Sequence, residues 1–122
     1  MLFFNEWNKG TAADSSFSNN LFIVEEGGRA TYDFGPSTGN VFENNVFCGH
    51  HEGLPAKATV TPAPRLAGRV RPAPGLDPLQ ALRPAEAKTF PRGVLIKDNG
   101  GRDFFGNPLP PGQPPRVGAF EK

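Results

Sequence analysis

The chain has little cysteine and no long apolar run, and both absences exclude whole classes of protein. Its single cysteine, Cys48, cannot build a disulfide framework within the chain or supply a cysteine-based zinc site. No apolar run reaches the ~18 residues that a membrane-spanning helix needs, so we expect no membrane span. The apolar start at Met1 turns polar at Asn5, too early for a signal peptide, and none is expected.

An excess of charge of one sign is also missing. The formal net charge is +1, which excludes a strongly basic nucleic-acid binder and an acidic tail. The arginines at positions 65, 69, 71 and 83 stand among prolines without interleaved aromatic residues. Nucleic acid is therefore not an expected partner.

What the chain does have is unevenly distributed. It holds 15 glycines and 14 prolines, a loop-rich composition, yet its 11 phenylalanines argue against a disordered linker. All prolines but Pro36 lie beyond Leu54. Residues 1–54 carry a net charge of −5 (two basic, seven acidic) and residues 55–122 carry +6 (eleven basic, five acidic). The composition therefore divides the chain at Leu54 into a regular part and a proline-rich part.

A repeat is the strongest pattern in the sequence. The motif Phe-x-Asn-Asn-x-Phe at positions 17–22 recurs at 42–47, an offset of 25 residues for both phenylalanines and both asparagines. A fixed period of this length indicates stacked repeats. The expected structural ladder consists of Phe17, Asn19, Asn20, Phe22, Phe42, Asn44, Asn45 and Phe47.

The segments around the motif read as short strands. Branched and aromatic residues predict strands at 21–24, 30–34 and 45–48, with glycine-containing turns between them. If the asparagine pair forms a bend, both phenylalanines of one motif face the same interior. Stacking at ~4.8 Å then places Asn20 beside Asn45, so that their amides form hydrogen bonds. We expect a structural role for these residues.

The motif at this interval resembles the right-handed parallel β-helix proteins of the pectate-lyase-like group. Residues 99–108 and 117–121 resemble the closing segment of many bacterial members, and residues 75–78 the short element before it. Residues 55–74 and 84–93 depart from the family's pattern, and Arg116 stands where an acidic residue is common. The resemblance implies an all-β fold: the last two to three coils of a right-handed parallel β-helix over residues 1–54.

The rest of the chain, residues 55–122, is expected to form a mostly irregular C-terminal cap of the same domain. Asp77 before Pro78 predicts one short helix at about 78–83, with an N-cap oxygen and a proline in the first turn. Residues 93–97 read as a strand that ends at a turn. Phe104, Phe105 and residues 117–120 are expected to bury apolar surface against the last coil and cover its open end.

Five residues are candidates for binding a ligand. Trp7 and Tyr32 are possible sugar-stacking rings, with burial as the alternative, and Asp33 lies beside Tyr32. His50 and His51 are candidates for a sugar contact or an acid–base role, with an exposed loop as the alternative. There is no third histidine and no calcium-loop spacing, so no metal site and no cofactor are expected in this chain.

The resemblance implies a secreted or envelope protein, extracellular or periplasmic, that binds or degrades polysaccharide or a cell-surface glycan. Its parent would be a lyase or a glycosidase, in which calcium also occurs. Because the repeat begins close to Met1, we expect a C-terminal fragment without a complete active site, whose missing upstream coils would be its partners. The alternatives are a noncatalytic adhesion or scaffold module and a truncated product without activity. The sequence predicts no reaction type.

Overall fold

The structure is a computed structural model that describes residues 2–3, 10–56, 58–62, 64–68, 71–85 and 87–121. These residues form eight strands of two to four residues and two short 3-10 helices. The strands are β1 (Leu2–Phe3), β2 (Ser16–Ser18), β3 (Leu21–Ile23), β4 (Ala30–Asp33), β5 (Val41–Glu43), β6 (Val46–Cys48), β7 (His51–Glu52) and β8 (Thr59–Thr61). The helices are η1 (Asp77–Leu82) and η2 (Ala87–Thr89).

The prediction of a right-handed parallel β-helix is wrong. The strands lie in three small separate sheets, ordered β1-β4-β7, β2-β5 and β3-β6-β8, and none of these sheets closes. The physical reason is the density of turns, because residues with positive φ angles directly follow β2 (Asn19), β5 (Asn44), β6 (Gly49) and β7 (Gly53) and end these strands after two or three residues. Most of the described chain is therefore irregular.

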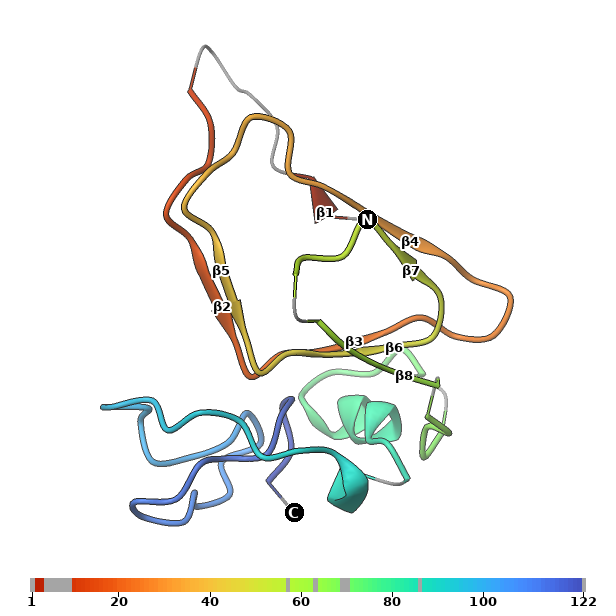
Figure 1. Cartoon of the computed structure of the whole chain (residues 1–122). Coiled ribbons are helices and arrows are strands. Elements are labelled where there is room, and N and C mark those ends of the chain that lie inside the picture. Colours follow the sequence, from red (N-terminus) through yellow and green to blue (C-terminus); the bar gives the residue numbers. More distant parts are fainter. Residues whose placement is uncertain are drawn as a thin grey trace.

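Pairing within the sheets is parallel, and the register follows the repeat. Phe17 lies opposite Phe42 in the β2–β5 pair, and Phe22 lies opposite Phe47 in the β3–β6 pair. Strand β8 extends the β3-β6 pair and places Val60 opposite Phe47. The three sheets lie along three sides of a common interior (Figure 1).

Aromatic rings fill this interior. The rings of Phe17 and Phe42 stack with centroids 4.7 Å apart, and those of Phe22 and Phe47 stack at 4.8 Å. Tyr32 of β4 meets the last pair edge-on, at 6.3 Å from Phe22 and 5.6 Å from Phe47. Each such ring pair contributes about 0.5–1.5 kcal/mol beyond the burial of its area. The left-handed bend at Asn19 and Asn44 lets both phenylalanines of one motif join the interior.

The second asparagine of each motif holds the two copies together. The Asn45 side-chain oxygen accepts hydrogen bonds from the backbone N–H of Asn20 (2.9 Å) and from its side-chain amide (3.0 Å). The Asn45 side-chain amide donates to the carbonyl of Phe17 (2.8 Å). Asn45 is only 5% exposed, so these bonds satisfy a polar group that burial would otherwise leave without partners.

The C-terminal segment, residues 64–121 where described, lies beside the β3-β6-β8 sheet (Figure 1). Val117 packs with Val46 and Cys48 in a buried cluster, and Leu21, Ile23 and Phe90 pack against it. The segment therefore covers the outward face of this sheet. The helix expected at about 78–83 is the 3-10 helix η1, with Pro78 in its first turn and no side-chain cap at its N-terminus. Residues 93–97 form no strand and stay irregular.

Candidate functional site

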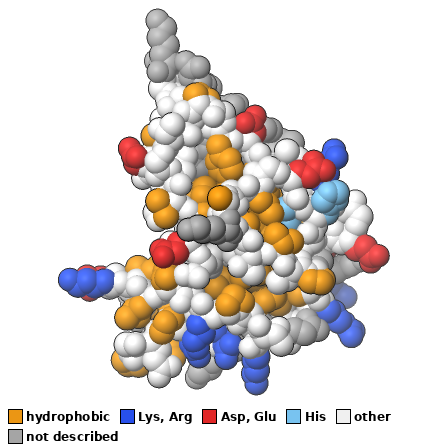
Figure 2. Space-filling model, in the orientation of Figure 1, with side chains coloured by type: hydrophobic (Ala, Val, Ile, Leu, Met, Phe, Trp, Pro, Cys, Tyr) orange, Lys and Arg blue, Asp and Glu red, His pale blue; other side chains and the backbone are white. Residues whose placement is uncertain are grey.

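A cleft of about 850 Å³ lies between part of the repeat and the C-terminal segment, next to the buried cluster that joins them. Its upper wall comes from β3 and from the bend between β2 and β3, and its lower wall comes from residues 102–104 and 115–121. Hydrophobic side chains gather between these two parts, and Lys and Arg side chains lie on the far side of the segment (Figure 2). The volume lies within the range of ligand sites, and an apolar lining with a few polar groups is typical of them.

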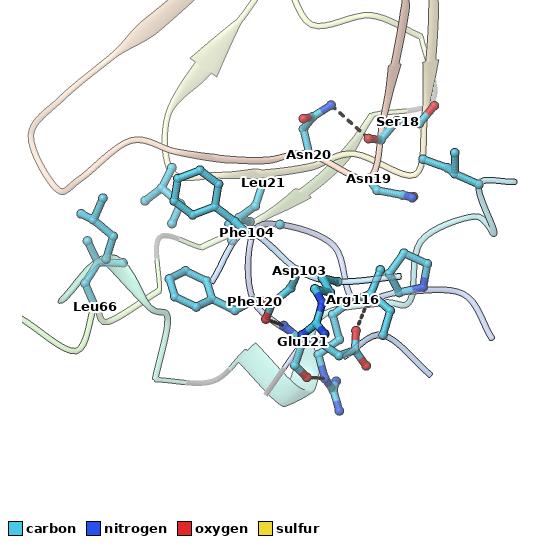
Figure 3. Close-up of a pocket in the computed structure, with 18 of the residues that line it drawn as sticks. Ser18, Asn19, Asn20, Leu21, Leu66, Asp103, Phe104, Arg116, Phe120 and Glu121 are labelled. Carbon is cyan, nitrogen blue, oxygen red and sulfur yellow. Dashed lines mark hydrogen bonds between the residues drawn. The ribbon is translucent and has the colours of Figure 1, made fainter. Parts of the chain in front are cut away.

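Aromatic rings dominate the lower wall. Figure 3 shows the ring of Phe104 near Leu21 and the ring of Phe120 below it, with Leu66 to one side. Phe120 stacks on Phe105 with centroids 4.7 Å apart, and Phe105 meets Phe104 edge-on at 5.1 Å. Phe104 itself is 56% exposed, although it is a large apolar side chain. Its ring is a supported platform with a face left open to solvent.

Asp103 fixes the loop that carries this platform. One carboxylate oxygen accepts the backbone N–H groups of Phe105 (2.9 Å) and Asn107 (2.8 Å). The other accepts the Asn107 side-chain amide (2.9 Å) and the backbone N–H of Glu121 (3.1 Å). Burial raises the pKa of the Asp103 carboxyl, but these hydrogen bonds to its charged form outweigh burial and hold the pKa below its ordinary value.

Glu121 joins the end of the described chain to the same wall. Its carboxylate is 3.3 Å from the guanidinium of Arg92 and accepts the backbone N–H of Arg116 at 2.9 Å. The Arg116 side chain donates in return to the Glu121 carbonyl at 3.2 Å. Glu121 is 8% exposed, so its charge is buried with its partners in place. Both Asp103 and Glu121 therefore have structural roles in the wall of the cleft.

Asn19 joins the two walls. Its side-chain amide donates to the carbonyl of Val94 (2.9 Å), and its side-chain oxygen accepts the Val94 N–H (2.7 Å). Its own carbonyl accepts the N–H of Gly118 (2.8 Å). A Cβ atom at Gly93 would collide with the Asn19 side chain, which explains the glycine at this close approach. The equivalent Asn44 has the same left-handed backbone but no such partner within the described residues.

Tyr32 and His51, two of the predicted ligand-binding residues, meet inside the molecule. The Tyr32 hydroxyl lies 2.9 Å from His51 Nδ1, and His51 Nε2 lies 3.0 Å from the carbonyl of Cys48. A carbonyl only accepts, so Nε2 donates and Nδ1 accepts the tyrosine proton. Tyr32 is 7% exposed, and burial raises the pKa of its hydroxyl. Both side chains have their polar atoms paired within the fold.

Asp33 and His50 lie on the surface. The Asp33 carboxylate accepts the N–H of Gly35 (2.9 Å) and stabilises a turn. His50 Nε2 lies 3.4 Å from Glu52, which also pairs with Arg29 at 3.5 Å. The exposed Arg29–Glu52 pair is worth about 0–1 kcal/mol. Trp7 lies outside the described residues, so the structure gives it no position.

No metal site and no membrane helix is found in the part of the chain that the structure describes. Within the described ranges, no group of three or more His, Cys, Asp or Glu side chains has a metal-binding arrangement. The longest helix there, η1, has six residues, and none of the helices is long and apolar enough to cross a bilayer.

The sequence pattern does not indicate the cleft as a site. It predicts that Phe104 and Phe105 bury apolar surface, whereas the Phe104 ring stays exposed. The available signal was the turn after Asp103, in which an Asp–Asn pair four residues apart holds a loop that presents two phenylalanines. No protein family matches this chain, and neither characterised proteins nor solved structures show a match.

Proposed function

We propose that the chain is a noncatalytic carbohydrate-binding module that holds one stretch of a polysaccharide or cell-surface glycan in the cleft. The exposed ring of Phe104 carries the proposal. The C–H face of a sugar ring packs on an aromatic face, and polar side chains at the rim of the same cleft bind its hydroxyl groups. Glu25 and Arg102 line the cleft and offer an acceptor and donors for those hydroxyls.

The carboxylates of the cleft support binding over hydrolysis. A glycosidase uses two carboxyl groups on either side of the scissile bond. Of the three carboxylates that line the cleft, Asp103 and Glu121 are held by backbone N–H groups and by Asn107 and Arg92. Of these three, only Glu25 has a carboxylate without a hydrogen-bond partner among the described residues. One unengaged carboxylate supplies half of the pair that hydrolysis needs.

A glycan ligand is consistent with a protein that acts outside the cell or in the cell envelope, and we include that location in the proposal. Cys48 is the single cysteine of the sequence and its thiol is buried. The fold therefore needs no disulfide bond within the chain in an oxidising compartment outside the cell.

The test is binding of the whole chain to a panel of immobilised neutral and acidic polysaccharides, followed by calorimetry with soluble oligosaccharides of each hit. We expect binding to one class of glycan, weakened about tenfold or more by Phe104→Ala. Leu95→Ala is the matched control, because Leu95 is 54% exposed and does not line the cleft. Failure to bind any glycan, or equal affinities of the Phe104→Ala and Leu95→Ala variants, would contradict the proposal.

A further inference from the structure

Among the residues that the structure describes, the β2-β5 sheet has one strand fewer than each of the other two sheets. Sheets β1-β4-β7 and β3-β6-β8 each have three strands, whereas β2-β5 has two. After β7 the chain crosses inside the outline of the sheets instead of running beside β5 (Figure 1). Leu54 and Pro55, which lie on this shorter path, line a cavity together with Phe42 of β5. Among the described residues, no strand pairs with the second edge of β5.

The backbone of β5 shows which groups this edge presents. The N–H of Val41 donates to the backbone carbonyl of Ser15 (2.8 Å), and the backbone carbonyl of Glu43 accepts the N–H of Asn19 (3.3 Å). Both residues thus direct their backbone groups toward β2. Because successive residues of a parallel strand direct their groups to alternate edges, the N–H and C=O of Phe42 face the second edge.

The space beside this edge has the size of a side chain. A cavity of about 230 Å³ lies there, lined by Phe34, Ser37, Gly39, Asn40, Phe42, Leu54 and Pro55. The ring of Phe42 stacks on Phe17 and meets Phe34 edge-on at 5.3 Å. An apolar ring that enters this cavity would lie against aromatic and apolar neighbours.

In the neighbouring β3-β6-β8 sheet, a third strand pairs with the edge of β6 that corresponds to the open edge of β5. Strand β8 runs parallel to β6, with Val60 opposite Phe47. The N–H of Gly49 donates to the carbonyl of Thr61 at 3.0 Å. Phe42 and Phe47 are the first and the second phenylalanine of the same motif. Both rings face the same interior. The protein thus already adds a parallel strand with an apolar central residue next to a phenylalanine of the motif.

We propose that the free edge of β5 binds an extended peptide of a partner protein as a third, parallel strand, with an aromatic residue opposite Phe42 and a basic residue opposite Glu43. Strand addition of this kind uses backbone hydrogen bonds for affinity and alternate side chains for specificity. Glu43 is exposed, and residues 1–54 carry a net charge of −5, so a basic residue in the partner is complementary.

A second copy of the chain does not fit this edge. If the copy placed its β2 beside β5, its β3 would follow directly after the bend at Asn19 and would fall beside β6. Strand β8 already pairs with β6 at that position. The occupant is therefore a single extended peptide, and the site is separate from the cleft proposed to bind glycan.

The test uses the whole chain and an acetylated, amidated pentapeptide of threonine, valine, phenylalanine, lysine and threonine. Binding is followed by nuclear magnetic resonance. In a parallel register, the lysine N–H donates to the Phe42 carbonyl, whereas the phenylalanine N–H faces away from β5. We expect methylation of the lysine amide nitrogen to weaken binding about tenfold or more, and methylation of the phenylalanine amide nitrogen to leave it within about twofold.

A charge exchange tests the side-chain pair. The substitution Glu43→Lys is expected to weaken the lysine peptide several-fold and to strengthen a peptide with glutamate at that position. Circular dichroism of the variant checks its fold, and Glu26→Lys, an exposed change outside this edge, is the control. Absence of binding by the lysine peptide, equal effects of the two methylations, or no effect of Glu43→Lys would overturn the proposal. Glycan binding is expected to be unchanged by Glu43→Lys, so failure of either proposal leaves the other testable.

Discussion

Asn19 and Val94 are joined by a pair of hydrogen bonds across 75 positions of sequence. The Asn19 amide donates to the Val94 carbonyl at 2.9 Å, and its oxygen accepts the Val94 N–H at 2.7 Å. A side-chain amide matches a backbone amide in both donor and acceptor, so this one residue satisfies both groups of Val94. It connects the repeat with the C-terminal segment and thereby forms one end of the cleft.

The first prediction separates this connection from the backbone bend. Asn19→Ala and Asn44→Ala both place alanine in a left-handed conformation, but only Asn19→Ala removes the bonds to Val94. We expect Asn19→Ala to lower the free energy of unfolding by about 1–3 kcal/mol more than Asn44→Ala. Urea unfolding followed by circular dichroism measures the difference. Equal losses in the two variants would show that the bonds to Val94 contribute nothing.

The second prediction concerns the asymmetry between Asn20 and Asn45. Asn45→Ala removes the side-chain acceptor of the partly buried Asn20 N–H and one donor to the Phe17 carbonyl, so we expect a loss of about 2 kcal/mol or more. Asn20→Ala leaves both of those bonds in place, and we expect a loss of about 1 kcal/mol. The measurement is again urea unfolding of each variant. A larger loss in the free energy of unfolding for Asn20→Ala than for Asn45→Ala would contradict this prediction.

The sequence carried the pairing of the repeat but not the fold built on it. An equal offset of 25 residues sets Phe17 against Phe42 and Phe22 against Phe47, and the structure has these residues opposite one another. The repeat motif does not specify whether a further strand pairs with each of the three sheets. In the described part of the chain after β7, no strand pairs with β5. The repeat therefore predicts a continuous β-helix from a local pairing that a few short strands also satisfy.

The cleft could not be predicted from spacing. Asn19 and Val94 are far apart in sequence, and no periodicity relates them. The exposure of Phe104 depends on where Asp103 holds the loop, which in turn depends on the N–H of Glu121. For Tyr32, the sequence left open whether the ring is a sugar platform or buried, because a tyrosine in a strand can face either side. In the structure its ring is 7% exposed.

The third prediction is that the stability of the fold depends on pH through the Asp103 carboxylate. Because the folded-state pKa of Asp103 lies below its ordinary value, the carboxylate contributes stability that is complete above that ordinary value. This contribution is lost as the pH falls through the folded-state pKa. We expect Asp103→Asn to be less stable than the parent at pH 7, with the difference shrinking as the pH is lowered below about 4.

Thermal unfolding at a series of pH values measures this effect. Asp98→Asn is the control, because Asp98 is exposed and its left-handed backbone also suits asparagine. We expect that variant to keep the pH dependence of the parent. A constant difference between Asp103→Asn and the parent from pH 7 to pH 3 would contradict the assigned role of the carboxylate.

The fourth prediction concerns the thiol of Cys48. Its side chain is completely buried, and burial raises its pKa more than the contact with the Thr61 hydroxyl at 3.1 Å lowers it. We expect a disulfide reagent at pH 8 to modify the folded protein roughly 100-fold more slowly than the protein in urea. A cysteine introduced by Ser16→Cys into the Cys48→Ala variant is exposed and is expected to react fast. Equal rates for the folded and unfolded protein would place Cys48 at the surface.

The central claim is that the cleft between the repeat and the C-terminal segment binds a glycan through Phe104. Its most direct test is nuclear magnetic resonance of isotope-labelled protein titrated with the oligosaccharide found in the binding screen. The account predicts that the largest shifts fall on the Phe104 ring and on the methyl groups of Leu21 and Leu66, which line the cleft. Shifts confined to the surface around His50 and Arg29, which do not line the cleft, with Phe104 unmoved, would contradict it.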